Sequence, residues 1–227
     1  MKPAIKPEKR ASTGRQRRPG GRSQRVWEAV AAATESILIE KGLDDIGVVE
    51  IARLAGVNPT TIYRRWGDRD TLLMEVLMTH AEAALPLPDT GTLRGDLRAY
   101  LGEAASLLQS SFGSALLQLG ALALRRPQLQ VQRKAYWEAR LKTFDELIAR
   151  AIKRREIAPG LDPGRLLEAL GGPLYARLLF TGDAIDSALI DATIERALCG
   201  LAGARVRQRR RKPEPTPKRR PRRSGRA

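Results

Sequence analysis

The sequence contains few of the residues from which catalytic and metal sites are built: one cysteine, one histidine and only 4% aromatic residues among 227. The single Cys199 excludes an intramolecular disulfide and fits a reducing compartment. With only His80 beside it, the chain lacks the ligands of a Cys- or His-based zinc site. The motifs Gly-x-x-x-x-Gly-Lys-Ser/Thr, Gly-x-Gly-x-x-Gly and Gly-x-Ser-x-Gly are also missing. We therefore expect no catalytic residues, no metal and no cofactor.

Long apolar runs are missing as well. No stretch of about eighteen apolar residues occurs, so the sequence predicts no conventional membrane-spanning helix. The N-terminus is basic but has no apolar core of the kind found in a secretory signal. We expect a cytoplasmic protein, associated with the nucleoid if it binds DNA, and without stable insertion into a membrane.

The formal net charge of +16 is concentrated at the two ends of the chain. Residues 1–25 carry nine Lys or Arg and one Glu, and residues 203–227 carry twelve and one, so the middle has a charge of about −3. Both ends are poor in large apolar residues, which predicts disordered basic arms over 1–21 and 203–227. Such arms can add sequence-independent affinity for DNA, attract anionic lipid or simply solubilise the protein.

Residues 48–66, VVEIARLAGVNPTTIYRRW, predict two short helices joined by a tight turn. Val48, Ile51 and Ala52 lie at helical spacing and give the first helix an apolar face. Gly56 supplies the positive φ that ends this helix. The layout is that of a helix-turn-helix, whose second helix enters a DNA major groove, although an ordinary helical hairpin has the same pattern.

The second helix of this pair has distinct buried and outward faces. Asn58 fits an N-cap, with Pro59 at the first helical position, where a missing N–H costs nothing. Ile62 and Trp66 recur four residues apart and are expected in the core. The remaining side chains suit phosphates and base edges, and these are Thr60, Thr61, Tyr63, Arg64 and Arg65.

The segment 22–84 resembles the DNA-binding domain of the tetracycline-repressor (TetR) family of bacterial transcription regulators. The matching signature is IARLAGVNPTTIYRRWGDRDTLLMEV, with its alanine–glycine turn, Thr/Tyr recognition helix, aromatic residue and basic residue at the start of the next helix. The resemblance implies that Tyr63 and Arg69 bind phosphate and that Arg64 reads sequence. With Arg22 just before the first helix, the candidate DNA contacts are Arg22, Asn58, Thr60, Thr61, Tyr63, Arg64, Arg65 and Arg69.

Helical periodicity resumes after a Pro/Gly connector, LPLPDTGTL, and no stretch alternates like a strand. The fold class is therefore predicted to be all-α, with a three-helix helix-turn-helix domain over 22–84 and a helical effector-binding and dimerisation domain over 85–202. The expected helices of the second domain lie near 92–110, 113–125, 128–155, 163–181 and 186–202.

The last two of these helices are apolar enough to be buried on more than one side. In the TetR family such helices form a four-helix dimer interface, so the resemblance implies a homodimer. Two operator half-sites about 34–36 Å apart also require two recognition helices related by two-fold symmetry. A pocket for an apolar or aromatic effector would lie between the helices. Its candidate lining residues, each of which could equally be ordinary core, are Tyr100, Leu107, Phe112, Leu116, Trp137, Phe144, Tyr175 and Phe180.

These features together indicate a transcription regulator that binds double-stranded DNA in a sequence-specific way. We expect a homodimeric repressor that a small-molecule effector releases from a palindromic operator. The alternative is an architectural or nonspecific DNA-binding protein driven by its basic tails, whose binding would fade steeply as salt rises.

Overall fold

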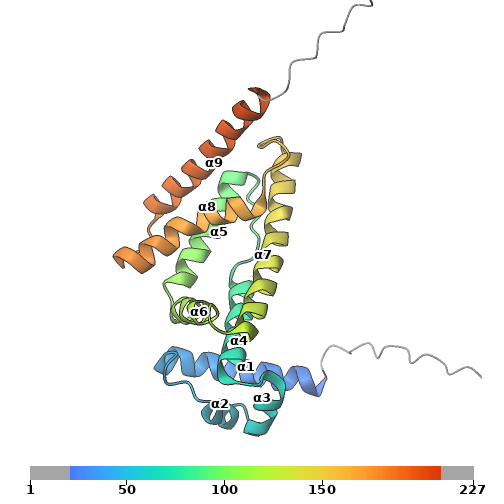
Figure 1. The fold of residues 1–227 in the computed structure, drawn as a ribbon, viewed down its shortest axis with the longest axis vertical. Coiled ribbons are helices and arrows are strands. Elements are labelled where there is room, and N and C mark those ends of the chain that lie inside the picture. The colour runs from blue at the N-terminus through green and yellow to red at the C-terminus, as the bar shows by residue number, and fades with distance from the viewer. Residues whose placement is uncertain (1–20, 211–227) are drawn as a thin grey trace, which may run out of the picture. The chain divides into compact units, whose positions relative to one another are not determined.

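The computed structural model describes residues 21–210, and helices joined by short connections make up this part of the chain (Figure 1). Side chains are described for residues 21–199. This part of the chain contains no strand, which confirms the all-α fold class. None of its helices combines the length and the apolar character needed to cross a membrane. The arm expected over 1–21 and most of the tail expected over 203–227 lie outside the described residues.

The chain divides into two compact units, Met1–Val76 and Leu77–Ala227, which we call the first and the second unit. The sequence placed the boundary after residue 84, whereas the division falls earlier, inside a continuous helix. The first unit contains three complete helices and the start of a fourth: α1 (Arg22–Lys41), α2 (Val48–Leu54), α3 (Pro59–Trp66) and α4 (Arg69–Ala84).

The core of the first unit follows the helical spacing of its apolar residues. α1 packs on α2, and α2 packs on α3. Gly56 has a φ of 65°, in the left-handed region that a side chain rarely adopts, and it turns the chain between α2 and α3 as the sequence predicted. The side chains that close this core, each at most 1% exposed, include Val30, Ile37, Ile51, Ala52, Ile62 and Leu72.

The second unit contains the five helical segments that the periodicity predicted, with ends shifted by a few residues. One of them changes character: the helix expected over 163–181 is α-helical only to Ala176 and ends in a π-helical turn, η1. The last helix also continues beyond its expected end, so residues 203–210 are helical. The elements are α5 (Leu93–Leu108), α6 (Ser111–Leu122), α7 (Pro127–Lys153), α8 (Pro163–Ala176), η1 (Arg177–Thr181) and α9 (Ser187–Arg210).

The core of the second unit forms where α5, α7, α8 and α9 meet. α5 packs against α7 and α9, and α8 packs against the same two helices, as Figure 1 shows. Phe144 is completely buried at the centre, and the Tyr100 ring meets it edge to face with a centroid distance of 5.0 Å. Other residues of this core that are at most 1% exposed include Leu97, Leu147, Ala151, Leu170, Leu174 and Ile194.

A buried carboxylate fixes the connector that leads into α5. Asp96, which is fully buried, accepts hydrogen bonds from the Thr90 amide (2.6 Å) and the Thr90 hydroxyl (2.8 Å). It also forms an ion pair at 2.7 Å with Arg154, the residue that follows the last residue of α7. Burial alone would raise the pKa of Asp96, but the two bonds from Thr90 and the charge of Arg154 outweigh it and hold the pKa below its usual value.

Candidate nucleic-acid interface

The start of α3 is fixed by its N-cap. The Asn58 side-chain oxygen accepts a hydrogen bond from the Thr60 amide (2.9 Å) and another from the Thr60 hydroxyl (2.7 Å). Pro59 occupies the first helical position. Both features confirm the prediction from the sequence, and the cap leaves the first turn of α3 as a defined surface.

The other end of α3 is held by a carboxylate on α4. Glu75 accepts a hydrogen bond from the Trp66 indole N–H at 3.0 Å and another from the Trp27 indole N–H of α1 at 2.8 Å. We call these three residues the Glu75 clamp. Trp66 is only 5% exposed and Ile62 is fully buried, so both residues anchor α3 as predicted. The clamp ties α1, α3 and α4 together at one carboxylate, and the sequence pattern gave no sign of it.

The outward face of α3 is polar, and the helical geometry gives each of its residues a defined position around the helix. At about 100° per residue, Arg64 lies opposite the buried pair Ile62 and Trp66, and Thr60 and Thr61 lie on either side of Arg64. Tyr63 lies at a border of this face and is 50% exposed. Arg64 and Thr60 are exposed, and Thr61 is half-buried. A helix that enters a groove in this orientation presents Arg64 to the base edges and its borders to the phosphates on the groove walls.

Arg65 is exposed but already has partners within the first unit. Its Nη1 donates to the Ser23 carbonyl at 2.9 Å, and its guanidinium carbon lies 4.7 Å from the centroid of the Trp66 ring. These contacts place it beside the start of α1, where Arg22 is the first helical residue and is exposed. The two arginines therefore extend the basic surface of α3 toward the N-terminus of α1.

Arg69 is turned inward, which differs from the phosphate contact that the resemblance implied. Its Nε donates to the Ile46 carbonyl at 2.6 Å, its Nη2 donates to the Leu43 carbonyl, and its Nη1 pairs with Asp70 at 3.2 Å. The two carbonyls belong to the connection between α1 and α2, where no helix supplies them with N–H partners. Arg69 thus holds this connection, and a phosphate would have to use the N–H groups that remain.

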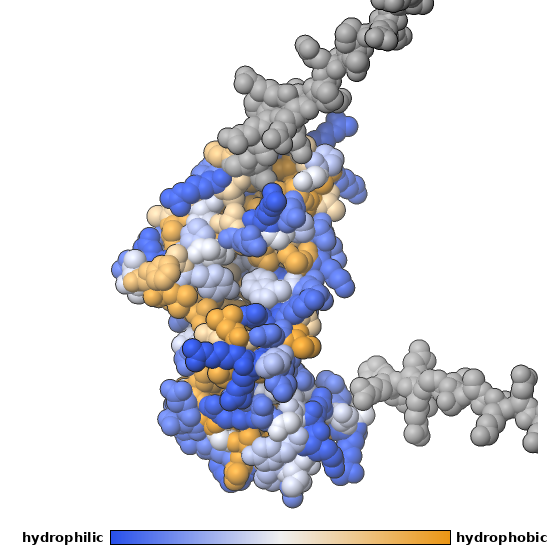
Figure 2. Space-filling model, in the orientation of Figure 1, coloured by the Kyte–Doolittle hydropathy of each residue, from blue (hydrophilic) through white to orange (hydrophobic). Residues whose placement is uncertain are grey.

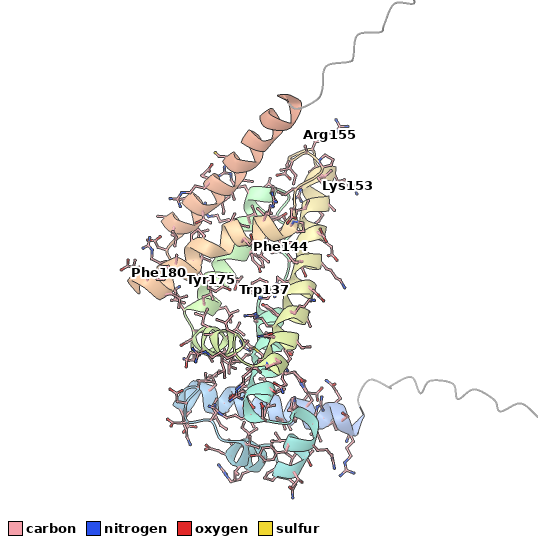
Figure 3. All side chains as sticks on the ribbon, viewed as in Figure 1. Trp137, Phe144, Lys153, Arg155, Tyr175 and Phe180 are labelled. Atoms are coloured by element: carbon pink, nitrogen blue, oxygen red, sulfur yellow. The ribbon has the colours of Figure 1, made fainter. Side chains whose placement is uncertain are left out.

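The eight candidate pocket residues of the second unit fall into three groups. Tyr100, Leu107 and Phe144 are buried, and Phe112, Leu116 and Tyr175 are half-buried against the same core. Trp137 is 37% exposed. Phe180 is 85% exposed because η1 carries it past the end of α8, so the expectation that it lines a pocket within the protomer is wrong. Figure 3 shows Phe180 at the outer end of this helix, well away from Phe144.

A polar centre that the sequence did not reveal lies beside this core. Arg140 of α7 is only 4% exposed, and its guanidinium lies over the rings of Tyr100 and Tyr136. Burial raises the pKa of Tyr100 to about 12 and also raises the pKa of Tyr175, so both phenols stay protonated at neutral pH. In the described part of the chain, no group of three or more His, Cys, Asp or Glu residues is placed to hold a metal ion.

Comparisons with known proteins match both units. A family model described as "Bacterial regulatory proteins, tetR family" matches residues 30–76, and one described as "Tetracyclin repressor-like, C-terminal domain" matches residues 87–197. The HTH-type transcriptional regulator AqdR of Rhodococcus erythropolis is 32% identical over 179 residues, which are 79% of this chain and 86% of that protein. The DNA-binding transcriptional repressor TetR of Mycobacteroides abscessus is 29% identical over 177 residues, 76% of this chain and 92% of that protein. The crystal structure of the TetR family transcription regulator SCO0332 is similar with a TM-score of 0.69 and 28% identity, and the match covers 77% of this chain and 97% of that one.

Proposed function

The chain belongs to the TetR family of bacterial transcription regulators, and on that premise we propose that it is a homodimeric repressor whose DNA binding is relieved by a small-molecule effector. Each protomer places α3 in the major groove of one half of a near-palindromic operator. The effector binds the second unit and favours a conformer with lower affinity for the operator. A coupling free energy of about 1–3 kcal/mol between the two sites is enough to change operator occupancy. This function places the protein at the chromosome, in the cytoplasm.

The observation that carries the proposal is the fixed, polar outward face of α3. Its N-terminus is capped by Asn58 and its C-terminus is bonded to Glu75, so the helix is held at both ends. We assign Arg64 to a base edge, because it lies opposite the buried face and a guanidinium suits the two acceptors of guanine. Tyr63 and Arg65, at the borders of the face, are assigned to phosphates.

The surface of α8 and η1 supports the homodimer. Leu179 is 62% exposed and Phe180 is 85% exposed, and Figure 2 shows apolar surface at this end of the helix. Adjacent large apolar side chains with this exposure are typical of surfaces that a partner covers. A two-fold axis beside η1 brings the same patch of both protomers together and buries both aromatic rings.

The repressor assignment has weaker but independent support, since the Mycobacteroides abscessus relative is named a DNA-binding transcriptional repressor. A repressor needs only to occupy its operator, whereas an activator also needs a surface for the transcription machinery. The proposal therefore predicts that binding alone blocks a promoter in a purified transcription assay.

The test is the sequencing of genomic fragments that the purified full-length protein retains at physiological salt. A shared palindrome, bound roughly 10³-fold or more tightly than unrelated DNA, supports the proposal. Arg64→Ala should then cost about 1–3 kcal/mol and relax the preference at one base position. Lys142→Ala, an exposed cation of α7, is the matched control and should leave operator binding unchanged.

The same experiment tests the alternative, an architectural protein that binds through its basic ends. That alternative is favoured by the concentration of positive charge in residues 1–25 and 203–227. Fragments without a common site, together with affinity that falls steeply with salt and ignores Arg64→Ala, would replace the repressor by this second function.

A further inference from the structure

The chain enters the first unit beside the last turn of α3. The Nη1 of Arg65 donates to the Ser23 carbonyl at 2.9 Å and to the Ser23 hydroxyl at 3.3 Å. Figure 1 shows the start of α1 on the same side of this unit as α3. A segment that precedes Arg22 therefore begins next to the helix that we assign to the major groove.

The Glu75 clamp is a second link at the same place. Trp27 lies about one turn after Ser23 on α1, and its indole N–H donates to the Glu75 carboxylate at 2.8 Å. The indole N–H of Trp66, at the end of α3, donates to the other oxygen of this carboxylate at 3.0 Å. The start of α1 and the end of α3 are thus joined by a guanidinium and by a shared carboxylate, which fixes the point where the preceding segment begins.

The residues before α1 combine positive charge with small side chains. Residues 1–20 contain seven Lys or Arg and one Glu, and residues 10–21 include no large apolar side chain. α1 itself has no acidic residue in its first turn. The three cations that most closely precede α1 are all arginines, and these are Arg15, Arg17 and Arg18.

The dimensions of DNA put a minor groove within reach of these arginines. Arg15 is seven residues before Arg22, so an extended chain carries it up to about 23–25 Å from the start of α1. A turn of B-DNA is about 34–36 Å long, so the minor groove next to an occupied major groove lies roughly 17 Å away. This groove is only about 6 Å wide, which suits small residues and single side chains. The arginines can enter it while α3 stays in the major groove.

Arginine suits a minor groove better than lysine does. A guanidinium is more weakly hydrated than an ammonium, so it loses less when a narrow groove displaces its water. Runs of A·T pairs have a narrow minor groove with an enhanced negative potential, which attracts inserted arginines. A G·C pair instead places the guanine amino group in this groove. A minor groove that receives these side chains is therefore expected to be rich in A·T pairs.

We propose that Arg15, Arg17 and Arg18 of each protomer bind the minor groove that adjoins the half-site read by α3, and that the operator is rich in A·T pairs there. This inference rests on the proposed function, because it adds a second reading element to the same operator. The segment before α1 then contributes sequence preference as well as charge, whereas contacts with phosphates alone are independent of sequence. Each half-site is correspondingly longer than the contact of α3 requires.

The test is the selection of binding sites from duplexes with a random central segment, at physiological salt and with the full-length protein. We expect a palindrome with A·T-rich positions beside each half-site. A variant with all three arginines replaced by serine should keep the palindrome, lose the A·T preference and bind the selected site about tenfold or more weakly. The slope of log affinity against log salt should also fall by about 5, because six arginines of a dimer no longer contact the DNA.

The matched control removes three charges from the same segment at a greater distance from α1. A variant with Lys2→Ser, Lys6→Ser and Lys9→Ser should bind all sequences somewhat more weakly and keep the A·T preference. An A·T preference that this variant also loses would assign the effect to overall charge and overturn the reading role of the arginines.

Modified duplexes identify the groove with the unchanged protein, so this measurement does not depend on how a variant folds. An inosine·cytosine pair has the minor-groove pattern of A·T and the major-groove pattern of G·C, because it lacks the guanine amino group. Exchange of the A·T-rich positions for G·C should lower affinity about fivefold or more, and exchange for inosine·cytosine should leave it unchanged. An equal loss with both exchanges would overturn the minor-groove contact.

The outcomes separate this inference from the proposed function. A palindrome without an A·T preference, or with one that the arginine variant keeps, overturns the minor-groove contact and leaves the regulator in place. An A·T preference that depends on the arginines but comes without a palindrome supports the contact and overturns the repressor, because α3 then reads no sequence. A palindrome with an A·T preference that depends on the arginines supports both.

Discussion

Replacement of Glu75 by glutamine is expected to weaken operator binding, because it opens the clamp that positions α3. A carboxylate accepts hydrogen bonds at both oxygens, from Trp27 at 2.8 Å and from Trp66 at 3.0 Å. A glutamine amide keeps one acceptor oxygen and presents an NH₂ donor in place of the other. One indole N–H then loses its acceptor in a part-buried site, at a cost of about 1–3 kcal/mol, and the remaining bond loses the assistance of the charge.

The variant affects DNA binding because the helix that loses its anchor is α3. Trp66 is the last residue of α3, so a loosened indole lets the C-terminal turn of the helix move away from its docked position. We expect a loss of about tenfold in operator affinity, equivalent to about 1.4 kcal/mol. The free energy of unfolding of the first unit should fall by a similar amount and leave the protein folded at 25 °C.

The indole N–H resonances in a nitrogen-15 spectrum provide the decisive assay. The signals of Trp27 and Trp66 should both shift in Glu75→Gln, while that of Trp137, in the second unit, should stay in place. Glu40→Gln, an exposed acid on α1, removes the same charge without touching either indole and should change neither spectrum nor affinity. Shifted indole signals with unchanged operator affinity would refute the positioning role, and unshifted signals would refute the clamp itself.

Three further predictions concern the core, the acid response and the assembly. Ile62→Ala should lower the free energy of unfolding by about 2–5 kcal/mol, since its side chain is fully buried, and a loss below 1 kcal/mol in a urea titration would contradict the packing of α3. Asp96 has a pKa below its ordinary value of 3.8, so its contribution to stability is present above that pH and is lost as the pH falls through the lowered pKa. Asp96→Asn should therefore destabilise the protein at neutral pH and make its free energy of unfolding depend less on pH in acid. A variant whose free energy of unfolding falls with acid as steeply as that of the unchanged protein would contradict this origin. Phe180→Asp should weaken self-association about tenfold or more in analytical ultracentrifugation, because it places a charge in the proposed interface, while an unchanged dimer would place the interface elsewhere.

Local chemistry explains why the reading helix could be predicted from the sequence. Asn58, Pro59 and Gly56 each act within two or three residues of their own position, through a cap, a fixed φ and a positive φ. The burial of Ile62 and Trp66 follows from a spacing of four residues. None of these features depends on knowledge of a distant segment, which is why the helix bounds and the two faces of α3 agree with the expectation.

Long-range contacts explain what the sequence could not reveal. Arg69 bonds to carbonyls more than twenty residues earlier, and Arg140 bonds to carbonyls more than fifty residues earlier. A basic residue on a helix has the same local pattern whether it faces solvent, DNA or a buried carbonyl. Phe180 was misplaced for a related reason: helical periodicity assumes 3.6 residues per turn, and η1 departs from it.

The π turn at Arg177–Thr181 accommodates one residue more per hydrogen-bonded turn than an α-helix does. Deletion of a single residue there would allow ordinary α geometry and would turn Leu179 and Phe180 by about 100° relative to Leu174. If the gene is duplicated and one copy loses a single codon in this segment, the two proteins therefore expose different side chains on this surface. Two sister proteins that differ by such a gap could lose the ability to pair with each other in one evolutionary step, before any substitution alters their DNA-reading helices.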